Sequence, residues 1–187
     1  MCGKVIAEPK PKLKDNISVY ACLFVDMLSG YSMEIVELRR LERKFDRQSL
    51  ECILRSVEIS NSPDYPPAII DYQLHTHYTM DWLSKKMQSS YLVVALIDNK
   101  VVGTGSLDGN EVTTVFVDPD HQQRGIGRTI MGELERYAKS QDIREIILNS
   151  SITAFGFYKK LDYALVEEAV REYQGDKVIT YLMKKRL

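Results

Sequence analysis

The sequence predicts an α/β protein in which a mixed, mostly antiparallel sheet contains one central parallel pair and carries helices on both faces. Two observations support this fold class. Asp-Asn at 98–99 and Asp-Gly at 108–109 separate three strand-like runs, and turns of this kind join antiparallel neighbours. Further along the chain, an amphipathic helix separates two more runs, and the right-handed crossover of such a unit makes its strands parallel.

The elements follow one another in a simple order. Residues 33–38 alternate apolar and polar side chains as a strand does, and 49–59 has apolar residues at helical spacing. A loop rich in proline and polar residues, 60–67, precedes 68–87, where we expect one helix or two short ones. The remaining strands are expected at 91–97, 101–107, 111–117 and 145–149, with a final antiparallel pair at 163–170 and 177–183.

An apolar run at 17–28 follows several lysines and superficially resembles a signal peptide. However, Asp26 interrupts the run, no clear cleavage site follows, and a dozen residues are too few to span a membrane. We therefore divide the chain into an N-terminal extension, 1–32, and a domain, 33–187. We expect an accessory strand or helix that packs on the domain or on a second copy of the chain. Translation upstream of a true start at Met33 is the alternative.

The composition excludes several classes of protein. With 25 basic and 26 acidic residues the formal net charge is −1, which lacks the basic excess of a general nucleic-acid binder. Cys2, Cys22 and Cys52 contain no C-x-x-C pair, so they indicate neither a disulfide framework nor a zinc site. His75 and His77 lack an evident third ligand. We expect a cytoplasmic protein that uses no metal and has no nucleic-acid or membrane partner.

The stretch 122–128, Gln-Gln-Arg-Gly-Ile-Gly-Arg, connects a strand to an amphipathic helix. Free N–H groups at a helix start, together with the helix dipole, bind anions. Gly125 and Gly127 have no Cβ to keep a phosphate away from the backbone. Two nucleotide-binding motifs fit poorly, because Ile130 takes the third glycine position of G-x-G-x-x-G and Arg128 stands where a Walker A loop has lysine. The sequence thus predicts a different phosphorylated ligand.

The same stretch resembles the pyrophosphate loop (Q/R)-x-x-G-x-(G/A) of the GNAT superfamily of acetyl-CoA-dependent N-acetyltransferases. Three further features stand at the family's spacing: Val-Asp-Pro at 117–119 before the loop, a strand at 145–149 after the helix, and Ala-x-x-Phe-Tyr at 154–158. The resemblance covers about 33–187 and is clearest from 90 to 170. It implies a GNAT-like fold and acetyl-CoA as co-substrate.

In this family the strand before the loop and the strand after the helix splay apart, and the pantetheine arm of the cofactor enters the gap. The resemblance implies that backbone groups of Phe116 and Val117 pair with that arm, and that the N–H of Val117 stabilises the thioester oxygen. The residues implied in cofactor binding are Phe116, Val117, Gln122, Gln123, Arg124, Gly125, Ile126, Gly127, Arg128 and Asn149.

Two residues carry the implied chemistry. Tyr158 matches the family tyrosine that protonates the departing CoA thiolate. Glu111 stands eleven residues before Gln122, which is the offset of the base glutamate in one branch of the family. Strand alternation predicts that 111, 113, 115 and 117 share one face. The family usually has Gly-Phe or Gly-Tyr after the tyrosine helix, and here Asp162 takes the place of that glycine.

The resemblance predicts transfer of acetyl from acetyl-CoA to a primary amine by direct attack. A non-catalytic acyl-CoA sensor or partner-binding module on the same fold is the alternative, although a glutamate and a tyrosine at 111 and 158 favour the enzyme. The acceptor stays open among a polyamine, an amino acid, an aminoglycoside, a peptide N-terminus and a protein lysine. Specificity is expected in 45–90, and a homodimer is a candidate assembly.

Overall fold

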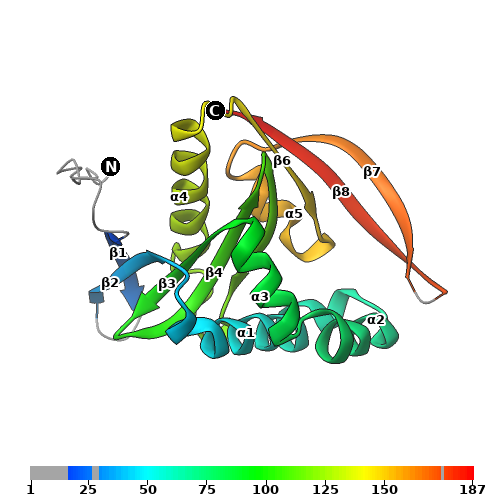
Figure 1. Cartoon of the computed structure of the whole chain (residues 1–187), viewed down its shortest axis with the longest axis horizontal. Coiled ribbons are helices and arrows are strands. Elements are labelled where there is room, and N and C mark those ends of the chain that lie inside the picture. The colour runs from blue at the N-terminus through cyan, green and yellow to red at the C-terminus, as the bar shows by residue number, and fades with distance from the viewer. Residues whose placement is uncertain (1–16, 27–29, 174) are drawn as a thin grey trace.

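The computed structural model describes residues 17–26, 30–173 and 175–187, and Figure 1 shows that one twisted sheet organises them. The sheet has eight strands in the order β1-β2-β3-β4-β5-β6-β8-β7. Every neighbouring pair is antiparallel except β5 and β6, which are parallel, as the sequence predicted. The strands are β1 (Ile17–Asp26), β2 (Gly30–Arg40), β3 (Tyr91–Ile97), β4 (Lys100–Asp108), β5 (Glu111–Val117), β6 (Glu145–Ser150), β7 (Ala164–Tyr173) and β8 (Asp176–Arg186).

Five α-helices cover the two faces of the sheet. They are α1 (Asp46–Arg55), α2 (Pro67–Tyr72), α3 (Met80–Ser89), α4 (Ile126–Ser140) and α5 (Ile152–Lys159). Two π-helical segments, η2 (Ser56–Asn61) and η4 (Gln73–His77), continue α1 and α2. The stretch 68–87 therefore forms separate helices. The hydroxyl of Thr79 accepts the N–H of Trp82, which caps the start of α3.

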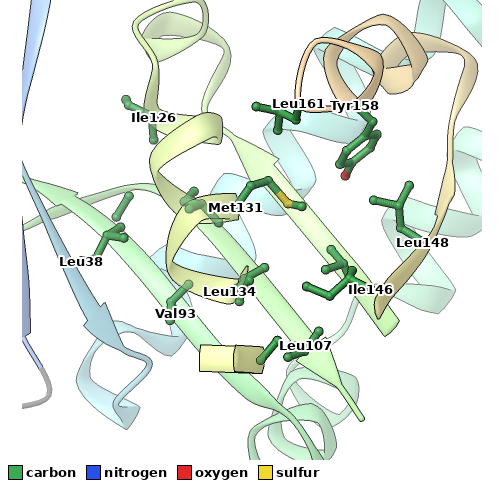
Figure 2. Packing of buried hydrophobic residues seen from close by; sticks show 14 of the residues in the cluster. Leu38, Val93, Leu107, Ile126, Met131, Leu134, Ile146, Leu148, Tyr158 and Leu161 are labelled. Atoms are coloured by element: carbon green, nitrogen blue, oxygen red, sulfur yellow. The ribbon is translucent and has the colours of Figure 1, made fainter. Parts of the chain in front are cut away.

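The larger core lies between α4 and the sheet, as Figure 2 shows. Ile126, Ile130 and Leu134 of α4 are buried at helical spacing, and they pack against strands β3 to β6. Gly103 and Gly105 in β4 allow this close approach. A Cβ on them would come within 2.8 Å and 2.3 Å of the Ile130 side chain. A substitution at either glycine would therefore force the Ile130 side chain, or α4 itself, to shift.

The opposite face of the sheet is covered by α1 and α3. Leu92, Val94 and Leu96 of β3 are buried there with Leu83 of α3 and Phe45 from the turn that precedes α1. The intervening β3 residues face α4 instead. Because β3 is buried on both sides, its sequence is a continuous apolar run. The prediction of helices on both faces is confirmed.

The hairpin turns are formed by the Asp, Asn and Gly residues from which the sequence predicted them. Asp98 and Asn99 have φ of 50° and 61°, and Gly109 has φ of 57°, so each hairpin uses residues that tolerate left-handed backbone. Asp162 adopts φ of 66° after α5. The aspartate thus takes the left-handed conformation that glycine most often adopts after a helix.

The apolar N-terminal segment forms a strand. β1 pairs with β2 over its whole length, from Ile17↔Arg39 to Asp26↔Gly30, and it forms one edge of the sheet. Of the two forms expected for the accessory segment, the structure has the strand. Residues 1–16 of the expected extension lie outside the described residues.

Candidate functional site

A gap opens between the two parallel strands. β5 pairs with β6 at only two positions, Glu111↔Ile147 and Val112↔Leu148. β5 nevertheless stays paired with β4 as far as Val117, and β6 stays paired with β8 as far as Ser150. The two strands therefore separate toward their carboxyl ends, and the predicted splay is confirmed.

Hydrogen bonding to β4 decides which β5 backbone groups face this gap. The N–H of Asp118 donates to the carbonyl of Val102 at 2.9 Å. Hydrogen-bonded pairs recur at every second residue of an antiparallel ladder, so Phe116, two residues before Asp118, is also hydrogen-bonded to β4. The backbone of Phe116 therefore faces β4. Val115 and Val117 belong to the alternate pairs, so their N–H groups point away from β4 toward the gap. The sequence named Phe116 and Val117; Val117 faces the gap, Phe116 faces β4 instead, and Val115 was missed.

A β-bulge changes the faces of β5. The register with β4 shifts between Ser106 and Leu107, opposite the start of β5. Thr113 bonds to Ser106 and to Lys86 on the α3 face, whereas Val115 and Val117 pack into the α4 core. The prediction that 111, 113, 115 and 117 share one face is therefore wrong, because the bulge breaks the alternation that it assumed.

The turn after β5 presents backbone amides at the N-terminus of α4. Gly125 is the N-cap residue with φ of 84°, and no side chain caps the helix there. The first α4 hydrogen bond runs from the Thr129 N–H to the Gly125 carbonyl, so the N–H groups of the first turn are left for an anion. Gln123 has φ of 61°, and such alternating backbone forms a concave anion site.

The two glycines of the turn have different functions. A Cβ on Gly125 would meet no atom within 4 Å, so a side chain there would project into open space. A Cβ on Gly127 would come within 3.1 Å of the Phe157 ring and 3.7 Å of Val117. Gly125 is therefore required for backbone conformation, and Gly127 for close packing of α4 against α5.

Two serines of η2 form hydrogen bonds that stabilise the turn. Gln122 Nε2 donates to Ser60 Oγ at 2.8 Å and to the Val117 carbonyl at 3.1 Å. Ser56 Oγ also bonds to the Val117 carbonyl, at 2.9 Å. The Gln122 amide is thus occupied by the protein itself, so this residue shapes the turn. Of the other expected residues, Ile126 is buried, Arg124 is half-buried and Arg128 is exposed.

An ion-pair cluster holds the same turn. Arg55 Nε contacts Asp118 at 2.9 Å, and its Nη2 contacts Asp120 at 2.8 Å. Burial acts to raise the pKa of Asp118, but hydrogen bonds from the Asp120 amide and His121, together with Arg55, keep it below its ordinary value. No sequence motif links α1 to the loop, so Arg55 could not be identified from the sequence.

Tyr158 lies on α5, which begins at the end of β6. Ser151 caps this helix by accepting the Ala154 N–H at 3.1 Å. Tyr158 is buried, and Figure 2 shows its hydroxyl directed from α5 toward the sheet, beside Leu148 of β6. Burial raises the pKa of Tyr158 above its ordinary value, so the phenol keeps its proton throughout the working pH range.

Glu111 and Asn149 meet on the α3 face of the sheet. Asn149 Nδ2 donates to Glu111 Oε1 at 3.1 Å. The carbonyl of the same amide accepts Arg171 Nη2 of β7 at 3.4 Å. Arg171 did not emerge from the sequence, because it belongs to no motif and only the sheet brings it beside β6.

Aromatic rings line the α3 side of β5. Tyr78 stands edge-on to Phe116 at 5.6 Å and to Trp82 at 5.0 Å, and His77 packs on Tyr78 at 4.6 Å. Burial and Lys86 lower the pKa of His77 below its ordinary value, so this imidazole is neutral at pH 7. His77, Tyr78 and Trp82 belong to 45–90, the segment in which specificity is expected from the sequence.

Across 17–26, 30–173 and 175–187, no three His, Cys, Asp or Glu side chains gather as metal ligands would. Within the same ranges no helix has the length and apolar character that crossing a bilayer requires.

Comparisons with known proteins agree with this geometry. The family model described as acetyltransferase (GNAT) domain matches residues 62–187. The chain is 24% identical over 152 residues to the uncharacterized N-acetyltransferase YafP of Escherichia coli (strain K12), covering 81% of this chain and 97% of that protein. It is 26% identical over 111 residues to glucosamine 6-phosphate N-acetyltransferase of Schizosaccharomyces pombe, covering 52% of this chain and all of that protein.

Solved structures share the fold. A GCN5-related N-acetyltransferase from Rhodopseudomonas palustris superposes with a TM-score of 0.75 at 19% identity, covering 80% of this chain and 94% of that one. The PaiA N-acetyltransferase of Thermoplasma acidophilum, solved in complex with coenzyme A, gives a TM-score of 0.66 at 19% identity, covering 81% and 99%.

Proposed function

Because the chain belongs to the GNAT acetyltransferase family, we propose that it transfers the acetyl group of acetyl-CoA to a primary amine by direct attack. The observation that carries the proposal is the combination of two features: the gap between β5 and β6, and the uncapped N-terminus of α4 at its mouth. A pyrophosphate fits the amides of the turn. A peptide-like arm fits the unpaired N–H groups of Val115 and Val117.

The backbone supplies the electrophilic part of the proposed site. In this proposal the Val117 N–H donates to the thioester oxygen as it gains negative charge. Its own carbonyl is held by Ser56 and Gln122, which fixes the orientation of the strand end. Gly125, Ile126, Gly127 and Arg128 offer amides to the pyrophosphate, and the guanidinium groups of Arg124 and Arg128 add positive charge.

The proton steps use two side chains on opposite faces of the sheet. Glu111 removes a proton from the acceptor ammonium, and the amine lone pair then forms a bond to the thioester carbon. As the carbon–sulfur bond breaks, Tyr158 gives its proton to the thiolate and recovers one from the amine nitrogen by way of solvent. Because its raised pKa keeps the phenol protonated until the thiolate forms, Tyr158 suits the role of proton donor.

The alternative is an acyl-CoA-binding module without catalysis. Both functions predict CoA binding, so the discriminating measurement is thiol release from acetyl-CoA with a panel of primary amines. The enzyme releases CoA thiol and forms one acetylated amine per thiol. If CoA binds but no amine in the panel increases thiol release, the catalytic proposal fails.

Three further assignments belong to this proposal. We infer a cytoplasmic location from the few scattered cysteines. We also infer the division into 1–32 and 33–187, with β1 as an edge strand contributed by the extension, and a homodimer as a candidate assembly. Gel filtration with light scattering tests the last of these.

A further inference from the structure

A row of polar side chains crosses four strands on the α3 face. It lies at the end of the gap where β5 and β6 are still paired. The register places Glu111 of β5 beside β6, Asn149 of β6 beside β8, and Thr180 of β8 beside β7. Arg171 of β7 completes the row. It donates from Nε to Thr180 Oγ1 at 3.2 Å and from Nη2 to Asn149 at 3.4 Å.

Arg171, at the positively charged end of this row, has N–H donors that form no hydrogen bond within the described part of the protein. Arg171 is exposed, and both of its bonds go to neutral groups. In the described part of the chain no carboxylate lies within 4 Å of its guanidinium nitrogens. A guanidinium has five N–H donors in a planar fork that suits a carboxylate or a phosphate. Three of those donors therefore face solvent or a ligand.

Asn149 fixes the spacing between the two charges. A carboxylate only accepts hydrogen bonds and a guanidinium only donates, so one orientation of the Asn149 amide satisfies both neighbours. Glu111 and Arg171 are thus held apart by a single amide group. An ammonium and an anion separated by a few atoms in one small molecule would match this spacing.

Lys86 does not compete for the anionic group of such a ligand, and Glu167 of β7 is a second exposed carboxylate on this face, paired with Leu182. Lys86 lies 3.4 Å from Asp108 and donates to Thr113 at 3.2 Å, so the protein already occupies it. The neutral aromatic wall of Tyr78 and Phe116 offers no counter-charge. A polyamine would bring a second ammonium toward Arg171 and be repelled.

We propose that the acceptor is a primary amine that also carries an anionic group, with its ammonium at Glu111 and its carboxylate or phosphate at Arg171. This inference rests on the proposed acetyltransferase function and names the chemical class of its acceptor. Arg171 is a specificity-determining residue, and Asn149 is a positioning residue that holds Glu111 and Arg171 in register.

The test uses matched acceptor pairs and the full-length protein. Thiol release is measured for amino acids against their carboxamides, and for amino-sugar phosphates against the unphosphorylated amino sugars. The anionic member of at least one pair is expected to have a kcat/KM about ten- to a hundredfold higher, because a hydrogen-bonded charge contributes that much to discrimination. The pair that shows the preference identifies the anion as carboxylate or phosphate.

Variants assign the preference to Arg171. Arg171→Gln should remove it by raising the KM for the anionic acceptor about ten- to a hundredfold, with the KM for acetyl-CoA unchanged. Arg171→Lys should keep part of it, since the charge remains but the planar fork is lost. Arg186→Gln, an exposed arginine of β8 on the same sheet face, is the matched control and should keep the preference. Asn149→Ala should raise the KM for the anionic acceptor while the KM for acetyl-CoA stays unchanged, because Asn149 holds Glu111 and Arg171 in register.

The outcomes separate the two proposals. Equal or better turnover of the neutral members, or a preference that survives Arg171→Gln, overturns this inference and leaves the acetyltransferase standing. If no amine of either kind increases thiol release, the acetyltransferase proposal fails, and this inference fails with it.

Discussion

Substituting Gly125 by glutamate tests the turn after β5 with little disturbance elsewhere. Gly125 has φ of 84°, and an added Cβ would meet no atom within 4 Å. The cost in stability therefore comes from backbone conformation alone, about 1–2 kcal/mol. Gly175 is the matched control, because it has φ of 86° and an equally empty surrounding in the β7–β8 hairpin. Gly175→Glu introduces the same backbone strain and the same charge, but at a site away from the turn at 122–128.

The effect on cofactor binding should be much larger than the effect on stability. The new carboxylate stands at the amides that we assign to the pyrophosphate. Two unit charges about 4 Å apart near a protein surface interact by about 4 kcal/mol. Since about 1.4 kcal/mol corresponds to a tenfold change, the Kd for CoA should rise about a thousandfold.

Isothermal titration with CoA measures this directly, and urea unfolding of the same preparations measures the strain. We expect both variants to lose similar stability and only Gly125→Glu to lose CoA. A CoA titration of Gly125→Glu that matches the wild type would refute the anion site. Equal loss of binding in Gly175→Glu would show that strain, and not the turn, is responsible.

Three other substitutions test separate parts of the account. Tyr158→Phe should lower kcat about a hundredfold or more while the Kd for CoA changes less than about twofold; unchanged turnover in stopped-flow thiol detection would remove Tyr158 from the mechanism. Gly127→Ala places a methyl group 3.1 Å from the Phe157 ring, so we expect crowding to offset the gain in helix propensity of about 1 kcal/mol, and a raised midpoint in urea unfolding would contradict that packing. Asp118→Asn removes a carboxylate whose pKa is lowered in the folded state, so its stabilisation is complete above the ordinary pKa of 3.8 and is lost as the pH falls through the lower folded value. The difference in unfolding free energy between wild type and Asp118→Asn should therefore be constant near neutral pH and shrink in acid, and a difference that grows on acidification would reverse the assignment.

Local sequence patterns were enough to predict most of the fold. The turns at 98–99 and 108–109 determined two hairpins, because Asp, Asn and Gly tolerate left-handed backbone. The helix after the glycine motif placed the parallel pair. The helical region 45–90 was harder to predict, since its π-helical segments carry no local sequence signature.

The site was predictable where a residue acts through its backbone or within a motif. Gly125 and Val117 stand where the loop pattern placed them. The alternation of β5 failed at Thr113, because a bulge depends on the partner strand and not on the residues of β5 alone. Arg55 and Arg171 were missed for a related reason. Each reaches the site from an element far away in the sequence, and only the folded sheet brings it there.

In this account the turn at 122–128 binds the pyrophosphate and the gap beside β5 binds the pantetheine arm of one CoA molecule. An amide NMR titration of the 21.5 kDa protein with CoA tests it residue by residue. We expect the largest shifts at the N–H groups of Val115, Val117 and Gly125 to Arg128, saturating at one equivalent. Shifts confined to other strands, with the Val117 and Gly127 amides unmoved at saturation, would contradict the account.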